Sequence, residues 1–198
     1  MSEARSIQTI RSDHLIAGLT ALAITIHIAE SALPSPLPGI KPGLANVVTL
    51  LVYCRYGWRM AAWVAVLRVL VGSILIGTFL SPTFFLSASG AIASITMLGL
   101  FSLFTPHRSE RQRLPGDDPL ASSWSVGPLG LGVATAMAHI TGQFWAAYVL
   151  FVPHHGILTL FPVLLALASI LGIVSGILTH TVLSQLNKTT YEHQQDNP

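Results

Sequence analysis

The sequence predicts an all-α integral membrane protein, a single bundle of six transmembrane helices, and two observations carry this prediction. Hydrophobic residues make up 52% of the 198 residues and charged residues only 9%, whereas about a quarter of the residues in a soluble domain are charged. The hydrophobic residues also gather in long runs, most of them close to the roughly 20 residues that one helix needs to cross a bilayer. Water is therefore not the main solvent of the chain, and no separate soluble domain is expected beside the bundle.

Six apolar segments follow one another, and each is expected to form one crossing. They cover residues 14–33, 42–56, 60–79, 82–104, 126–152 and 157–183. Ser81 and Pro82 begin the fourth segment with residue types that favour a helix N-cap and the first helical position. The polar stretch 105–125, which contains charges and prolines, is expected to be a cytoplasmic loop. The polar tail 187–198 is expected to be disordered.

The basic residues predict the orientation of the chain, because cytoplasmic loops of membrane proteins are enriched in Lys and Arg. With the N-terminus inside, the inner segments contain Arg5, Arg11, Arg55, Arg59, Arg108, Arg111, Arg113 and Lys188. The outer loops then contain only Lys41. We therefore predict a multi-pass protein of the cytoplasmic (inner) membrane with both termini in the cytoplasm. The net charge of +2 gives no reason to expect nucleic acid as a partner, so membrane lipid is the expected surroundings.

Polar side chains within or beside the apolar segments are the candidates for function, because a charge at the bilayer centre costs about 2.5 kcal/mol or more. The candidate ligand-binding residues are Glu30, Lys41, Asn46, Arg68, His139 and Gln143. Arg68 either pairs with Glu30 to join the first and third helices or contacts an anionic or polar ligand. His139 and Gln143, one turn apart, either hydrogen-bond a neighbouring helix or line a ligand site. Lys41 lies in an outer proline-rich loop that is either a stiff connection or a lid.

Small residues at helical spacing indicate where another helix can approach. Ala17 and Ala21 form a small-xxx-small pair in the first helix, which either docks a partner or arises by chance. Gly172 and Gly176 are expected to serve packing within their own helix. Cys54 is the single cysteine, so the chain has neither an intramolecular disulfide nor paired cysteine ligands, and no metal site is predicted.

Several blocks of the chain carry a family resemblance. They are the run HIAESALPSPLPGIKPGLAN that ends at Asn46, the group Tyr56-Gly57-Trp58-Arg59, the group Leu67-Arg68-Val69 and the run GTFLSP that ends at Pro82. Together they resemble the Gx transporter family, which is also labelled heptaprenyl diphosphate synthase component I. The wider group is similar to the S components of energy-coupling-factor transporters, six-helix membrane proteins whose outward ligand pocket is covered by the first outer loop. In that group an alanine pair on the first helix contacts the coupling subunit, and Ala17 and Ala21 match it in type and depth.

The resemblance implies a small-molecule-binding membrane subunit of a transporter for a vitamin-like or isoprenoid-related ligand. Its expected partners are a transmembrane coupling subunit and ATP-binding cassette subunits. One alternative is a non-transporting membrane subunit of a quinone- or flavin-linked electron-transfer complex, which would bind a flavin or quinone. A second alternative is an accessory component of prenyl diphosphate synthesis, which supplies quinone side chains. A third is a purely structural scaffold. No cofactor is predicted under the transport reading.

Catalysis by this chain is not expected. Prenyl diphosphate synthases resemble one another in DDxxD motifs, whose carboxylates hold magnesium against a diphosphate. Here Asp117 and Asp118 are followed by Pro119 and Leu120, and no second acidic cluster occurs. The sequence also lacks a P-loop, so ATP hydrolysis would have to come from partner subunits.

Overall fold

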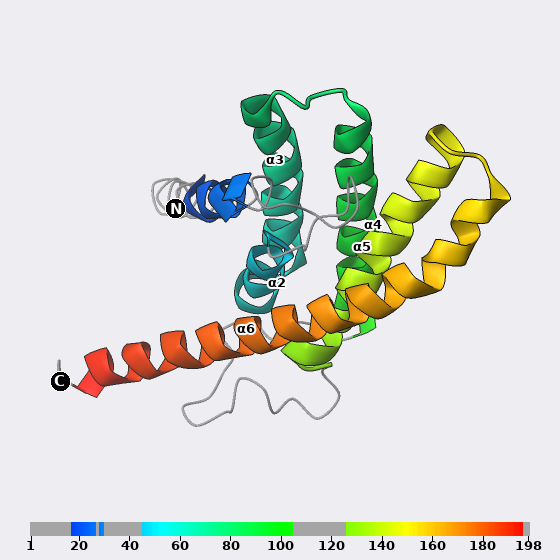
Figure 1. The fold of residues 1–198 in the computed structure, drawn as a ribbon. Helices are drawn as coiled ribbons and strands as arrows, with labels where there is room; N and C mark the ends of the chain where they lie inside the picture. Colours follow the sequence, from blue (N-terminus) through cyan, green and yellow to red (C-terminus); the bar gives the residue numbers. More distant parts are fainter. Residues whose placement is uncertain (1–16, 27, 30–44, 105–125, 196–198) are drawn as a thin grey trace.

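The computed structural model describes residues 17–26, 28–29, 45–104 and 126–195, and its regular elements there are all helices (Figure 1). A helical segment, Ala17–Ile26, comes first. It is followed by α2 (Ala45–Tyr56), α3 (Trp58–Ile76), α4 (Pro82–Phe104), α5 (Pro128–Leu150), the 3-10 helix η2 (His155–Leu160) and α6 (Phe161–Gln195). The all-α prediction is confirmed over the described residues. The predicted loop 105–125 lies outside them.

Glycine sets both ends of α3, and for that reason α3 differs from the predicted 60–79. Gly57 and Gly77 flank the helix with φ angles of 88° and 75°, values that cost glycine little and other residues more. Beyond the helix, Gly77 N–H donates to Ile74 O and Thr78 N–H donates to Ser73 O, which satisfies carbonyls at the helix end. The hydrophobic pattern continues to Phe79, but the chain has already turned. The next helix, α4, covers the predicted range 82–104.

The last helix is longer than predicted. It was expected to end at Leu183 and to be followed by a disordered tail, but α6 continues to Gln195. Each residue added to an existing helix forms one hydrogen bond, whereas starting a new helix is costly. A polar sequence without Gly or Pro can therefore continue a helix that has already formed. Residues 187–195 of the predicted tail thus belong to α6 in the structure, while residues 196–198 lie outside the described residues.

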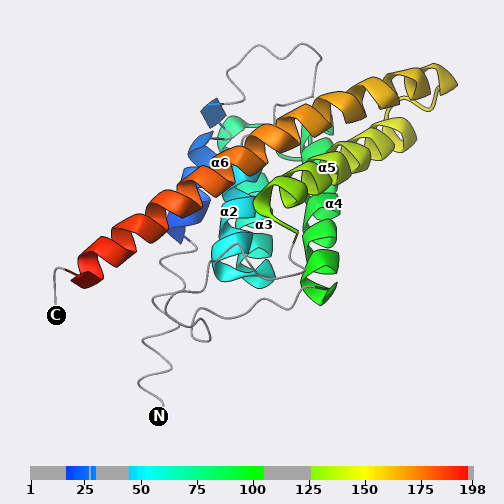
Figure 2. The ribbon, with the colours of Figure 1, turned by 90° about the horizontal axis from the view of Figure 1, so that it is seen from below.

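The helices are arranged as a layer with one long helix across it. α3 and α4 run antiparallel, joined by the short turn after Ile76, with α2 against α3 and α5 against α4 (Figure 1). α6 packs along α5 and then passes across α2, and its C-terminal part extends beyond the other helices (Figure 2). A core of buried apolar residues from the first helical segment, α2 and α3, with Leu98 and Leu131, joins the layer.

Three of the described helical stretches are long and apolar enough to cross a membrane: Trp58–Ile76, Pro82–Phe104 and His155–Gln185. Their outer faces carry large apolar side chains, such as Trp63 at 60% exposure, Ile92 at 64% and Ile170 at 60%. Such a surface suits lipid rather than water, and the chain is a membrane protein. α5, which has 23 residues and contains His139 and Gln143, is not among these stretches. That all six helices cross the bilayer stays a prediction.

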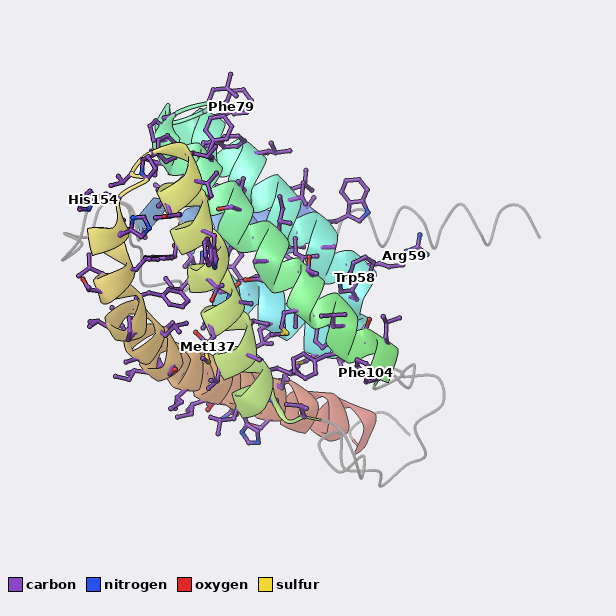
Figure 3. The ribbon with its side chains drawn as sticks, turned by 90° about the vertical axis from the view of Figure 1, so that its right-hand side faces the viewer. Trp58, Arg59, Phe79, Phe104, Met137 and His154 are labelled. Carbon is purple, nitrogen blue, oxygen red and sulfur yellow. The ribbon has the colours of Figure 1, made fainter. Side chains whose placement is uncertain are left out.

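The turns gather at two ends of the bundle. Phe79, after α3, and His154, after α5, lie at one end, whereas Trp58 and Phe104 lie at the other (Figure 3). This is the alternation expected when α3, α4 and α5 cross in succession. Which end faces the cytoplasm remains the prediction made from the basic residues.

The glycines of α6 pack between helices rather than within their own helix, so that expectation is wrong. A Cβ added to Gly172 would lie 2.6 Å from Cα of Val133, and one added to Gly176 would lie 2.6 Å from Cα of Leu129. From the other side, a Cβ on Gly132 would lie 2.5 Å from the carbonyl oxygen of Gly172. The backbones of α5 and α6 therefore touch, as small residues permit in membranes.

Candidate functional site

Arg68 lies inside the protein, on the buried face of α3. Its side chain is 4% exposed, and it shares its face with Val64, Ala65 and Gly72, which are also buried. A guanidinium stays charged at any physiological pH, so α3 carries a cation into the interior of a membrane protein.

A seam of uncharged polar residues joins α4 and α5. Ser94, buried on α4, donates a hydrogen bond from Oγ to the carbonyl oxygen of Thr135 at 3.1 Å. The same Oγ lies 3.3 Å from Nδ1 of His139. A hydroxyl has one hydrogen and a carbonyl oxygen can only accept, so Ser94 Oγ is left to accept from Nδ1–H of His139. One of the two alternatives for His139 was a hydrogen bond to a neighbouring helix. That hydrogen bond is present, and it orients the imidazole ring.

Gly90 makes room for the two polar side chains of α5. A Cβ built at Gly90 would lie 2.7 Å from Cε1 of His139 and 2.8 Å from Cγ of Gln143. Both side chains therefore lie over the same glycine of α4, in agreement with their spacing of one turn. Gln143 is 9% exposed and His139 is half-buried. The structure brings these two candidates together.

Arg68 and the seam lie at about the same depth. The distance along the sequence from Arg68 to Gly77, at the end of α3, equals the distance from Ser81, just before α4, to Gly90. With a rise of 1.5 Å per residue, both lie roughly 13 Å along their helices from the turn that joins α3 to α4. Because these helices are antiparallel neighbours (Figure 1), a charged residue and a polar seam occupy one level of the bundle.

The remaining candidate ligand-binding residues are less well placed. Asn46 is the second residue of α2 and is half-buried. Glu30 and Lys41 lie outside the described residues, as does the proline-rich loop around Lys41. The proposed pairing of Glu30 with Arg68 and the proposed lid therefore stay predictions.

The small-residue pair of the first helical segment faces outward. Ala17, Gly18 and Ala21 are all exposed, and a Cβ added at Gly18 would meet nothing within 4 Å. On the opposite side of the helix, Thr20 and Ala23 are buried against the bundle. The segment thus packs with one face and leaves its smallest side chains on the other.

Sequence reasoning missed the residues of α4 that complete the seam. Gly90 and Ser94 are four positions apart, the same small-xxx-small spacing that drew attention to Ala17 and Ala21. That signal was present in the fourth apolar segment, but it does not say which helix lies opposite. Thr135 was missed as well, since its part in the seam is a backbone carbonyl.

The comparison with protein families supports the resemblance drawn from the sequence. A family model described as heptaprenyl diphosphate synthase component I matches residues 19–182. The chain belongs to this family. The part that matches the heptaprenyl diphosphate synthase component I model includes Asn46, Arg68, His139 and Gln143. No curated protein and no solved structure matches the chain.

The described residues offer few groups for catalysis or for a metal. Among the residues in the described ranges, no three His, Cys, Asp or Glu side chains are grouped so that they could hold a metal ion. α4 and α5 contain no Asp, Glu, Lys or Arg. The arrangement is thus suited to hydrogen bonding and to electrostatic attraction by Arg68, which are the means of binding a small molecule.

Proposed function

We propose that this chain is the small-molecule-binding membrane subunit of a transporter, similar to an S component, which takes up a vitamin-like or isoprenoid-related ligand. The observation that carries the proposal is Arg68, a permanent cation that is 4% exposed in the middle of an apolar helix. Ionisable residues at membrane depth are costly, and they mark substrate pathways and ligand contacts. In this proposal Arg68 attracts an anionic or strongly polar part of the ligand.

The seam between α4 and α5 supports the same proposal. His139, oriented by Ser94, and Gln143, over Gly90, provide hydrogen-bonding groups at the depth of Arg68. A binding site in a helix bundle typically joins apolar walls to a few such polar groups. Asn46, Glu30 and the lid residue Lys41 complete the proposed site.

The exposed face of the first helical segment is the proposed docking surface for a coupling subunit. Its small residues, Ala17, Gly18 and Ala21, would let a helix of the partner approach closely. Energy would come from ATP-binding cassette subunits bound to that partner, because this chain has no P-loop.

The family description favours a second candidate function. Its words name a component of heptaprenyl diphosphate synthase, so the chain could serve as an accessory membrane component of prenyl diphosphate synthesis. The catalytic carboxylates would then belong to another subunit, since the sequence has no DDxxD motif. The same polar level of the bundle would hold an isoprenoid diphosphate near Arg68.

Gentle purification from native membranes tests these functions against each other. Transport predicts a colourless protein that copurifies with a coupling subunit and an ATP-binding cassette pair. Substituting both Ala17→Leu and Ala21→Leu should lower the recovered coupling subunit about tenfold, the effect of about 1.4 kcal/mol. The matched control, Ala166→Leu on the exposed face of α6, should change nothing. Visible absorbance would instead favour the electron-transfer alternative, and a copurified prenyl synthase the accessory role.

A further inference from the structure

The polar seam between α4 and α5 differs from the surroundings of Arg68 in having no formal charge. Over their whole length, α4 and α5 contain no Asp, Glu, Lys or Arg. A charged ligand group placed at this seam would lose its hydration without gaining a counter-charge from either helix. These two helices therefore favour a neutral part of the ligand at the seam.

Gln143 is the residue of the seam with unused hydrogen-bonding capacity. Its side chain is 9% exposed, and its carboxamide has no hydrogen bond within the described part of the chain. The carboxamide atoms are not among the fully enclosed side-chain atoms that lack a partner there, so a ligand group can reach them and form the missing hydrogen bonds. The neighbouring His139 is already oriented by Ser94 at 3.3 Å. The amide of Gln143 therefore determines which chemical group binds at the seam.

The chemistry of the amide specifies the kind of neutral group. A carboxamide presents an acceptor oxygen and a donor NH₂ side by side. A group that satisfies both has a donor and an acceptor side by side as well, as in the N–H and C=O edge of a lactam or an imide. A quinone offers acceptors alone and would leave the amide oxygen unpaired.

We propose that Gln143, seated over Gly90, recognises the lactam or imide edge of a neutral planar ring in the ligand. This inference rests on the proposed small-molecule-binding function and assigns the chemical class of the group bound at the seam. Gly90 belongs to the recognition because a Cβ there would come within 2.8 Å of Cγ of Gln143 and displace the side chain.

Fluorescence titration with lumichrome tests the proposal, because this neutral three-ring compound carries an imide edge. Purified full-length protein in detergent should bind lumichrome saturably, and Gln143→Met, which keeps the side-chain length, should weaken binding about tenfold. Thr141→Val is the matched control: its hydroxyl bonds the carbonyl of its own helix at Met137, and its affinity should equal that of the wild type. Each variant is first checked for an unchanged elution volume in size-exclusion chromatography.

Two further probes make the outcome decisive. 1,3-Dimethyllumichrome lacks the imide donor, and menadione has only carbonyl acceptors, so both should bind at least about tenfold more weakly than lumichrome. Equal binding of the three compounds, equal affinity of Gln143→Met and wild type, or no binding of lumichrome would overturn the proposal. If a small molecule nonetheless copurifies with the wild-type protein, the proposed function stands and the assignment to Gln143 alone fails.

Discussion

Gly176→Leu should separate α6 from α5 and leave a protein that is largely unfolded in detergent. A Cβ at this position would lie 2.6 Å from Cα of Leu129 and 2.9 Å from the carbonyl oxygen of Pro128. Both atoms belong to backbone and cannot rotate away. Overpacking costs about 1–3 kcal/mol, and backbone contacts on two atoms place this case near about 3 kcal/mol. The two helices would also lose the close contact that drives their association in a membrane.

The single cysteine provides the measurement. Cys54 is free and half-buried in α2, so a fluorogenic maleimide reports thermal unfolding through its reaction with this thiol. We expect the unfolding midpoint of Gly176→Leu to fall by about 6–12 °C, at about 2–4 °C per kcal/mol for a chain of this size, or the protein to react at once. Ala166→Leu, on the exposed face of the same helix, should keep the wild-type midpoint. An unchanged midpoint for Gly176→Leu would contradict the packing of α5 on α6.

Arg68→Ala should remove the bound small molecule while the helices stay assembled. Hydrogen bonds to charged groups contribute about 1.5–3 kcal/mol, so loss of the guanidinium should lower affinity at least about tenfold. Arg68→Lys keeps the charge but not the planar fork of donors, and it should retain part of the binding. The amount of small molecule released per mole of denatured protein is the measurement.

A structural role of Arg68 makes a different prediction. If Arg68 serves only to pair with Glu30, then Arg68→Ala should lower the unfolding midpoint, because an unpaired buried carboxylate remains. The double variant with Glu30→Gln would then restore the midpoint, and the retained small molecule would be the same in all variants. That result would remove Arg68 from the binding site and leave it as a link between helices.

The sequence predicted the helices well where local chemistry decides. Ser81 and Pro82 indicated the start of α4. The all-α fold followed from the composition and from the length of the hydrophobic runs. The end of α3 was missed, because the apolar pattern continues past Gly77 while the left-handed turn depends on one glycine. The end of α6 was missed, because a polar sequence without Gly or Pro reads as a tail although it can extend a helix.

The candidate site could be predicted only in part, and the reason is the uniform hydrophobicity of membrane helices. In a soluble helix an apolar stripe identifies the buried face, but here exposed Ile92 and buried Leu98 on α4 are equally apolar. Polar residues such as Arg68, His139 and Gln143 therefore stood out individually, whereas their surroundings did not. That Gly90 and Ser94 lie opposite the polar residues of α5 depends on which helices are neighbours, and local periodicity carries no such information.

Native mass spectrometry of the full-length protein, released from its own membrane into detergent, tests the central claim most directly. The claim is that the polar level of this bundle binds a small molecule. We expect a population whose mass exceeds that of the 198-residue chain by one small molecule that is not a phospholipid and that dissociates on activation as a single species. A spectrum that contains only the bare chain and its phospholipid adducts, with or without partner subunits, would contradict the account.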